Sequence, residues 1–381
     1  MDKVRYGVIG TGGMGTGHAR TMQNIEEAEL TAVCDIDEEA RKQVSEEYGV
    51  PGFKEHQSLC DSGLVNAIIV ATPHYFHPPI SIYAMKKGIH VLSEKPVSVT
   101  VQAADEMNRA AEETGVKFAV MYQSRAIPMN RAARKLVERG RLGKIYRTCM
   151  IEPNFRSQAY YNSAGWRATW KGEGGGVLIN QAPHGIDLFT WIGGLPSRVT
   201  AKTATKRHDI EVEDEVSALL EYPDGGMGYY YTSVNEFPTG RHMEFCGELG
   251  KLVLGEEGLK FTALDTPLRE FSGQTDQMWG KPEAHEEEVP LEERETGHGT
   301  IIRNLARAIL YDEPLLSPGV EGVQSVEMIN ALILSGKKGE PVDIPVDREE
   351  YEAFIEEMRG TSKAKRLAGP TQRITDPNLT R

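Results

Sequence analysis

Six residues near the start of the chain constrain its fold more than any other feature. Gly10-Thr11-Gly12-Gly13-Met14-Gly15 follows an apolar run at 4–9 and precedes a helical pattern at 15–25. In a chain with 39 glycines this G-x-G-x-x-G spacing could arise by chance, but Asp35 follows 20 residues after Gly15, at the end of a second apolar run. Gly10 permits a tight turn, Gly12 lets backbone approach a pyrophosphate, and Gly15 brings helix against strand. The segment therefore predicts a dinucleotide-binding turn.

Asp35 also indicates which dinucleotide binds. Its carboxylate would accept hydrogen bonds from both hydroxyls of the adenosine ribose and would repel a 2′-phosphate. The nearest basic residues, Arg41 and Lys42, come about a turn and a half later in a predicted helix. We therefore expect NAD as cofactor, with NADP less favoured.

The pattern along the rest of the chain predicts an α/β protein with two domains and a tail. Short apolar runs alternate with helical patterns, as in a doubly wound parallel sheet of the Rossmann type. From residue 144 onward, half-exposed strands follow one another through turns, which is typical of a large, open, mostly antiparallel sheet. The predicted parts are a Rossmann domain at 1–123, a second α/β domain at 124–358 and a tail at 359–381.

Individual elements can also be placed. The glutamate-rich stretch 283–295 is predicted to be a solvated loop. The strands expected in the first domain are 4–9, 30–34, 67–71, 90–92 and 118–121, and those in the second are 144–152, 198–207, 215–222, 227–234 and 242–246. The main helices expected are 15–25, 37–48, 77–87, 101–114, 128–139, 298–311 and 320–335.

Charge and cysteine content narrow the class of partner. Lys and Arg number 43 against 56 Asp and Glu, which gives a net charge of −13 and argues against nucleic acid or an anionic membrane surface. The four cysteines are scattered and contain no C-x-x-C pair, so we expect reduced thiols. Without a targeting segment or an apolar run long enough to span a bilayer, the sequence predicts a cytoplasmic protein.

Several further motifs carry a resemblance to a known family. The sequence resembles the Gfo/Idh/MocA oxidoreductases, which include glucose–fructose oxidoreductase and inositol dehydrogenase, over nearly the whole chain to about residue 346. The resemblance implies an NAD(P)-dependent oxidoreductase acting on CH–OH groups, whose open sheet often mediates homo-oligomers, here a dimer or tetramer. The motifs are the glycine turn, Ala71-Thr72-Pro73-His74-Tyr75-Phe76-His77, Ser93-Glu94-Lys95-Pro96, Arg125-Ala126-Ile127-Pro128, and Gly174-Gly175-Gly176-Val177-Leu178 leading to Asn180, His184 and Asp187.

The resemblance assigns two catalytic residues, Lys95 and His184. Lys95 would hydrogen-bond the reacting oxygen, and His184 would take the proton of the substrate hydroxyl. Asn180 stands where the family very often has Asp, and we expect it to orient substrate. Its spacing of four from His184 would place both on one face of a helix, but Pro183 either starts that helix or bends it. Asp187 is expected to orient the imidazole or bind a hydroxyl.

Other residues are expected to line the two halves of the cleft. His74 replaces the family's usual Asn, and although His74 and His77 are three residues apart, no third ligand is placed near them, so no metal site is predicted. The expected cofactor residues are Gly10, Thr11, Gly12, Gly13, Met14, Gly15, Asp35, Thr72, Pro73, His74, His77, Glu94, Lys95 and Gln123. The expected substrate residues are Asn180, Asp187, Arg125, Tyr122, Tyr160 and Trp166, with Arg156, Tyr161, Arg167 and Trp170 as weaker candidates.

The function predicted is an NAD-dependent dehydrogenase that oxidises a ring secondary hydroxyl of a sugar or glycoside to a ketone, with carbon 3 suggested by family analogy. The small-molecule alternatives are an inositol (cyclitol) dehydrogenase and a glycosidase or lyase that uses transient oxidation by bound NAD. A non-catalytic sensor is a third alternative, against which the Lys95 and His184 pair argues.

Overall fold

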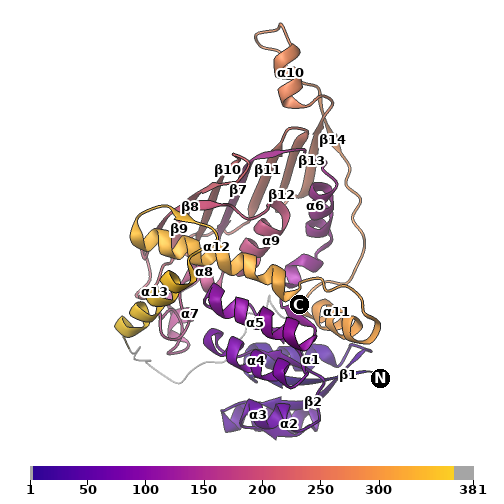
Figure 1. Ribbon diagram of the computed structural model, residues 1–381, viewed down its shortest axis with the longest axis vertical. Helices are drawn as coiled ribbons and strands as arrows, with labels where there is room; N and C mark the ends of the chain where they lie inside the picture. Colours follow the sequence, from indigo (N-terminus) through magenta and orange to yellow (C-terminus); the bar gives the residue numbers. More distant parts are fainter. Residues whose placement is uncertain (1–2, 364–381) are drawn as a thin grey trace.

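The computed structural model describes residues 3–363 and contains two sheets (Figure 1). The first sheet is wholly parallel, with the order β3-β2-β1-β4-β5-β6, which is the Rossmann order. The predicted strands are confirmed within two residues, while β3 was missed because only two of its residues pair. The strands are β1 (Val4–Ile9), β2 (Ala28–Cys34), β3 (Gly52–Phe53), β4 (Ala67–Val70), β5 (His90–Ser93) and β6 (Phe118–Val120).

The helices of this half begin and end where the sequence supplies caps. The Asp37 carboxylate accepts from the Ala40 amide, and the Thr100 hydroxyl accepts from the Ala103 amide, so both helices start at satisfied N-termini. Gly49 and Gly115 end the same two helices in the left-handed conformation. The helices are α1 (Gly13–Met22), α2 (Glu38–Tyr48), α3 (His56–Cys60), α4 (His77–Lys86), α5 (Val101–Thr114) and α6 (Pro128–Glu138), with short 3₁₀ turns at His74–Phe76 and Gln123–Ala126.

The second sheet has nine strands and is antiparallel except where β10 pairs with β7. The prediction of a loop at 283–295 is wrong in part, because four of those residues pair with β13 as the edge strand β14. The strands are β7 (Ile145–Pro153), β8 (Arg198–Ala204), β9 (Glu215–Glu221), β10 (Met227–Ser233), β11 (His242–Gly247), β12 (Gly250–Gly255), β13 (Gly258–Leu264), β14 (Ala284–Glu287) and β15 (Val342–Asp343).

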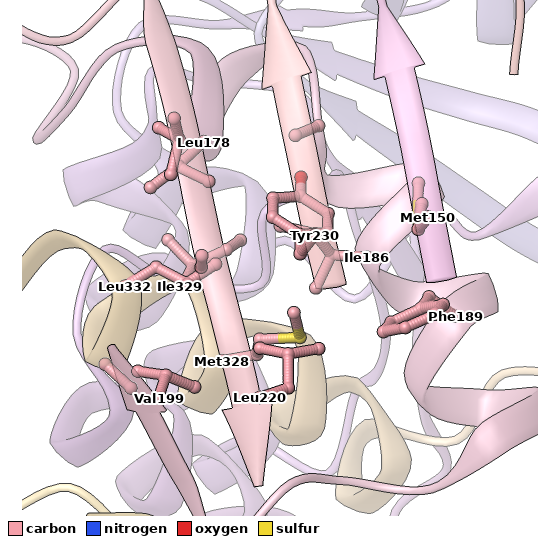
Figure 2. Packing of buried hydrophobic residues seen from close by; sticks show 14 of the residues in the cluster. Met150, Leu178, Ile186, Phe189, Val199, Leu220, Tyr230, Met328, Ile329 and Leu332 are labelled. Atoms are coloured by element: carbon pink, nitrogen blue, oxygen red, sulfur yellow. The ribbon is translucent and has the colours of Figure 1, made fainter. Parts of the chain in front are cut away.

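Helices cover one face of this sheet and form the larger core. Figure 2 shows Met150, Leu220 and Tyr230 of the sheet packed against Ile186 and Phe189 of α9 and against residues of α12. The sheet and these helices bury a continuous apolar cluster that positions the start of α9. The helices of this half are α7 (Gln158–Asn162), α8 (Val177–Asn180), α9 (Pro183–Gly193), α10 (Leu268–Gln274), α12 (Gly319–Lys338) and α13 (Arg348–Thr361).

Two late helices join the halves. On α12, buried Asn330 accepts from the Val101 amide and donates to the Val99 carbonyl, which fixes this helix to the start of α5. Helix α11 (His298–Tyr311) returns to the first sheet, where the Ile302 carbonyl accepts from the Tyr6 hydroxyl at 3.1 Å. The domain bounds stay a prediction, and residues 364–381 of the expected tail lie outside the described residues. None of the helices within 3–363 has both the length and the apolar composition that crossing a membrane requires.

Candidate active site

The glycine turn has the backbone geometry expected of it. Gly10 has φ of +93°, and a Cβ at this position would lie 2.5 Å from the Ala71 carbonyl oxygen. A Cβ on Gly15 would collide with the Gly10 carbonyl oxygen, whereas the space beside Gly12 is open. Gly13 and Met14 form the first turn of α1, whose amides are unsatisfied by the helix itself. The open side of this turn fits a pyrophosphate at a helix N-terminus.

Asp35 lies beside this turn at the end of β2. Its Oδ2 accepts from the Thr11 amide at 2.7 Å and from the Thr11 hydroxyl at 3.1 Å, and its Oδ1 accepts from the Asp37 amide at 2.8 Å. A carboxylate has about four acceptor positions, so one remains for a ribose hydroxyl. Arg41 donates to the Asp35 carbonyl at 2.7 Å. This arginine therefore lies closer to Asp35 than their separation in the sequence suggested.

Three buried polar atoms at the mouth of the parallel sheet have no hydrogen-bond partner among the described residues. They are Thr72 Oγ1 after β4, Gln123 Oε1 after β6, and His184 Nδ1 at the start of α9. Buried polar atoms without partners are rare in proteins and indicate a missing ligand or water. Because ligands bind at the carboxyl ends of strands in open α/β sheets, these atoms indicate the reactive part of the cleft.

Lys95 follows the end of β5 and extends toward Asn180. Its peptide bond to Pro96 is cis, and its Nζ donates to the Asn180 carbonyl at 3.0 Å. Burial lowers the pKa of Lys95, Glu94 and Glu173 oppose this effect, and two arginines add to it. Lys95 therefore reaches the second domain from the first.

His184 is the second residue of α9 and is partly exposed to the cleft. The edge of its ring faces the Tyr122 ring, with centroids 6.1 Å apart. Burial, together with the positive charge of Lys95, lowers the pKa of His184 to about 3, so the imidazole is neutral near pH 7. A neutral imidazole can accept a proton.

Asn180 ends α8, and the helix is interrupted at Gln181 and Ala182 before α9 begins at Pro183. Pro183 therefore starts a new helix, which is one of the two outcomes expected of this proline, and Asn180 and His184 do not share one helical face. The Asn180 Oδ1 accepts from the Tyr160 hydroxyl at 3.1 Å and from Gln181 Nε2 at 2.7 Å, and its Nδ2 donates to Glu173.

Glu173 and Gln181 are site residues that the sequence interpretation missed. Glu173 is 1% exposed, and burial raises its pKa to about 7 against the opposing effects of Arg167, the Ala168 amide and Lys95. Its position directly before the glycine triplet 174–176 was the available signal. The sequence did not indicate either residue, because their side-chain contacts with Asn180 form only in the folded structure.

The loop before the triplet supplies the aromatic wall of the site. Tyr160 and Trp166 are partly exposed, and the guanidinium of Arg167 lies 4.5 Å from the first ring centroid and 4.7 Å from the second. Trp166 packs edge-on against His74, at 6.2 Å between centroids. Two weaker candidates, Tyr161 and Trp170, are 3% and 2% exposed and belong to the core.

Three expected substrate residues are instead buried behind His184. Arg125 binds Asp187 through two hydrogen bonds, Nε to Oδ2 at 2.9 Å and Nη2 to Oδ1 at 2.7 Å, and both residues are 1% exposed. Tyr122 is fully buried, and its hydroxyl lies 2.5 Å from Ser325 Oγ. Direct substrate contacts by Arg125, Asp187 and Tyr122 are therefore contradicted, because their polar atoms are used within the protein.

Three expected cofactor residues also have other partners. Both ring nitrogens of fully buried His77 face main-chain carbonyls, of Pro96 at 2.9 Å and Thr72 at 2.7 Å. Glu94 binds His18 at 2.6 Å and the Lys95 amide at 3.1 Å, and His74 Nδ1 lies 3.0 Å from the Glu173 carbonyl. These side chains hold the turns in place. The expected direct contacts of the His77 and Glu94 side chains with the cofactor are therefore wrong, because their polar atoms are bonded within the protein. Pro73 separates Thr72 from this group and is partly exposed.

In the part of the chain from 3 to 363, no group of three or more His, Cys, Asp or Glu side chains could hold a metal ion.

Comparison with known proteins identifies both halves. An N-terminal sequence model described as "Oxidoreductase family, NAD-binding Rossmann fold" of the GFO_IDH_MocA group matches residues 4–122, and the GFO/IDH/MocA C-terminal domain matches residues 130–253. The WlbA dehydrogenase from Bordetella pertussis, solved in complex with NADH and UDP-GlcNAcA, is 28% identical, with a TM-score of 0.76 over 91% of this chain and 100% of that one.

Two curated relatives are similar in sequence. The 2,7-anhydro-N-acetylneuraminate hydratase of Mediterraneibacter gnavus is 30% identical over 58% of this chain and 58% of its own length. The glucose-6-phosphate 3-dehydrogenase of Bacillus subtilis is 29% identical over 57% of this chain and 61% of its own length. The matched region thus spans about three-fifths of these relatives. Together with the Rossmann strand order, the two family matches show that the chain belongs to the Gfo/Idh/MocA family of oxidoreductases, whose first domain binds NAD.

Proposed function

We propose that the chain is an NAD-dependent dehydrogenase that oxidises a ring secondary hydroxyl of a sugar or glycoside to a ketone. The observation that carries the proposal is the set of unpartnered buried atoms of Thr72, Gln123 and His184, together with the Lys95 side chain that extends from β5 to the Asn180 carbonyl. They lie where the carboxyl ends of the parallel strands meet the second domain. The 3-dehydrogenase from Bacillus subtilis favours carbon 3 as the position oxidised.

The residues of the chain divide the proton chemistry between them. His184 is neutral and takes the proton of the substrate hydroxyl, while the Lys95 ammonium donates a hydrogen bond to the oxygen as it becomes negative. Bound NAD⁺ supplies the acceptor for the hydride that leaves the same carbon. Asn180 has one amide N–H left to donate to a second hydroxyl, because its other amide positions are occupied. Tyr160 and Trp166 offer aromatic faces to the C–H side of a sugar ring.

Selectivity for NAD follows from Asp35. A 2′-phosphate would meet its carboxylate, whereas a ribose hydroxyl can donate to it. The nearby Arg41 guanidinium reduces this repulsion, since it lies against the Asp35 carbonyl. We expect kcat/KM with NAD to exceed that with NADP, and Asp35→Ala to reduce the difference.

The experiment is NADH formation, followed by absorbance, across a panel of aldoses, glycosides and cyclitols. Lys95→Ala should lower kcat about 10²- to 10⁴-fold with an unchanged unfolding transition, because it removes a hydrogen-bond donor used in the transition state. A Lys95→Ala variant with the wild-type rate would contradict the assigned mechanism even where the activity is present. Preferential oxidation of cyclitols would support the inositol dehydrogenase alternative.

A second candidate is favoured by the hydratase relative. An enzyme that oxidises its substrate transiently and then returns the hydride would cleave glycosides or add water without net NADH. Product analysis by chromatography, alongside the absorbance assay, separates the two candidates. Turnover of glycosides with no NADH accumulation would replace the dehydrogenase proposal.

The partner proposed for the protein surface is a second copy of the chain, in a dimer or tetramer. Apolar side chains are exposed on the outer face of the open sheet, where Leu219 of β9 lies opposite Tyr229 of β10. Their exposed fractions are 55% and 38%, and Met227 on the same face is 49% exposed. A double change of Leu219→Lys and Tyr229→Lys should yield monomers in light scattering. A cytoplasmic location stays a prediction, which cell fractionation would test.

A further inference from the structure

The mechanism above does not use Glu173, although its side chain reaches the site. One carboxylate oxygen accepts from Asn180 Nδ2, and the other accepts from the Ala168 amide at 2.5 Å. The residue is 1% exposed and follows the loop that carries Tyr160 and Trp166. Both of these partners are neutral N–H groups, so the Glu173 charge is not neutralised through them.

The contacts of Asn180 show what Glu173 does locally. An amide side chain can be rotated by half a turn with little change in shape, which exchanges its oxygen and nitrogen. Here the Tyr160 hydroxyl and Gln181 Nε2 both donate to Oδ1, while Glu173 accepts from Nδ2. Glu173 is the acceptor among these three, so it selects the orientation in which the remaining Asn180 N–H is a donor.

The charges around Glu173 are mainly positive. Lys95 and Arg167 both act on its carboxyl, Glu213 is a negative group that acts in the opposite sense, and His74 contacts its main-chain carbonyl. Around Lys95, the negative groups are Glu94 and Glu173, and the positive ones are Arg167 and Arg156. Glu94 is already bound to His18 at 2.6 Å. Glu94 and Glu173 are therefore the two carboxylates that balance the ammonium group, and Glu173 is the one that also binds Asn180.

We propose that Glu173 is a positioning residue of the active site, which orients the Asn180 amide and supplies the counter-charge for the Lys95 ammonium group. The inference rests on the proposed function for its catalytic meaning. It also assigns a physical role that can be measured without turnover. Asn180 has no carboxylate of its own. Glu173 supplies one, which is bonded to the side-chain amide of Asn180.

The first test measures Lys95 directly. Labelling of its amine by an acylating reagent, followed by peptide mass spectrometry across pH, reports the pKa of Lys95 whether or not a substrate is known. In Glu173→Gln the midpoint of labelling should fall by about one pH unit, because a nearby negative charge is lost. In Glu173→Asp, which keeps the charge, the midpoint should stay near that of the wild type. Equal midpoints in all three proteins would overturn the proposal.

Glu211→Gln is the matched control. Glu211 also accepts from a main-chain amide of the same loop, that of Trp170 at 2.7 Å, but its carboxylate is bonded to Ser362 and Lys363 rather than to Asn180 or Lys95. Its replacement should leave the Lys95 midpoint unchanged. A shift as large as that in Glu173→Gln would show that general loosening of the loop, and not the counter-charge, controls Lys95.

The second test uses kinetics on a substrate found in the panel. Glu173→Gln should lower kcat about ten- to a hundredfold with little change in KM, and should shift the acidic limb of the pH profile, because it removes a carboxyl whose pKa is raised by burial. The double variant Glu173→Gln/Asn180→Asp returns a carboxylate to the site and should recover most of the lost kcat. No recovery, with an unmoved pH limb, would overturn the positioning role. An absence of all activity in the wild type would contradict the proposed function and leave the labelling result to decide on Glu173.

Discussion

Two buried carboxylates belong to the candidate site, and they differ in their partners. Asp187, on the same helix, forms two hydrogen bonds with Arg125 behind the site. Glu173 precedes the glycine triplet, and its partners among residues 3–363 are two neutral N–H groups, the Ala168 amide and the Asn180 side-chain amide. Each is 1% exposed, so burial does not distinguish them. Asp187, which forms two hydrogen bonds with one arginine, contributes to the fold, whereas Glu173, which binds a residue of the site, can influence the chemistry.

The largest change in stability is expected when the ion pair between Asp187 and Arg125 is broken. Asp187→Asn leaves the Arg125 charge buried with only a neutral partner and the half-exposed Glu321, so the free energy of unfolding should fall by about 3–5 kcal/mol. Urea unfolding at neutral pH measures this. Activity per folded molecule should stay near the wild-type value.

A matched control uses an exposed arginine–glutamate pair. Arg134 and Glu138 lie four residues apart on α6, 2.8 Å from Nε to Oε1, with side chains 31% and 52% exposed. Glu138→Gln should change stability by less than about 1 kcal/mol. If Asp187→Asn cost no more than this, the distinction between the two buried carboxylates would be wrong.

Glu152 on β7 is a third buried carboxylate, and it can be compared with the arginine-paired Asp187 and with Glu173, which has no such partner. Its Oε2 has no hydrogen-bond partner among the described residues, its Oε1 lies 3.4 Å from Arg241, and burial raises its pKa to about 7. The folded protein thus keeps a proton that the unfolded chain loses above its ordinary pKa of 4.5. The stability that this group contributes is present below pH 4.5 and is lost as pH rises through 7.

Glu152→Gln removes that dependence on pH. Relative to the wild type, the variant should gain about 1–3 kcal/mol of unfolding free energy between pH 5 and pH 8. Paired urea titrations of both proteins at the two pH values measure the difference. If the change in unfolding free energy were the same at both pH values, Glu152 would resemble Asp187, whose charge is paired with an arginine.

The smallest effect is expected at Tyr122, whose ring lies between the buried ion pair and His184. Tyr122→Phe removes the hydrogen bond with Ser325 but keeps the ring, so stability should fall by about 1 kcal/mol. Because the hydroxyl does not face the cleft, kcat should change by less than about twofold. Thermal unfolding and steady-state rates check both values, and a large loss of kcat would assign the region behind His184 to the reaction.

Elements with strong local patterns were predictable from the sequence. The parallel strands are continuous apolar runs because helices cover both faces, and the bounds of α5 and α11 coincide with those predicted because their apolar faces repeat at the helical period. Strands β12 and β13 were missed, although Gly255-Glu256-Glu257-Gly258 between them forms a two-residue hairpin turn. The edge strand β14 was taken for loop because glutamates carry no strand preference, and it is held only by pairing with β13.

The candidate site divides in the same way. The sequence by itself determined the glycine turn and placed Asp35 at the end of β2, because turn glycines and strand ends are properties of a few consecutive residues. The roles expected of Lys95 and His184 came from the family resemblance and stay predictions. Only the tertiary structure decided that Arg125 and Asp187 bind each other, that His77 joins two turns, and that Glu173 reaches Asn180. Side chains far apart in sequence become partners through packing, and burial then makes each unpaired charge costly, so partner choice is set by the whole fold.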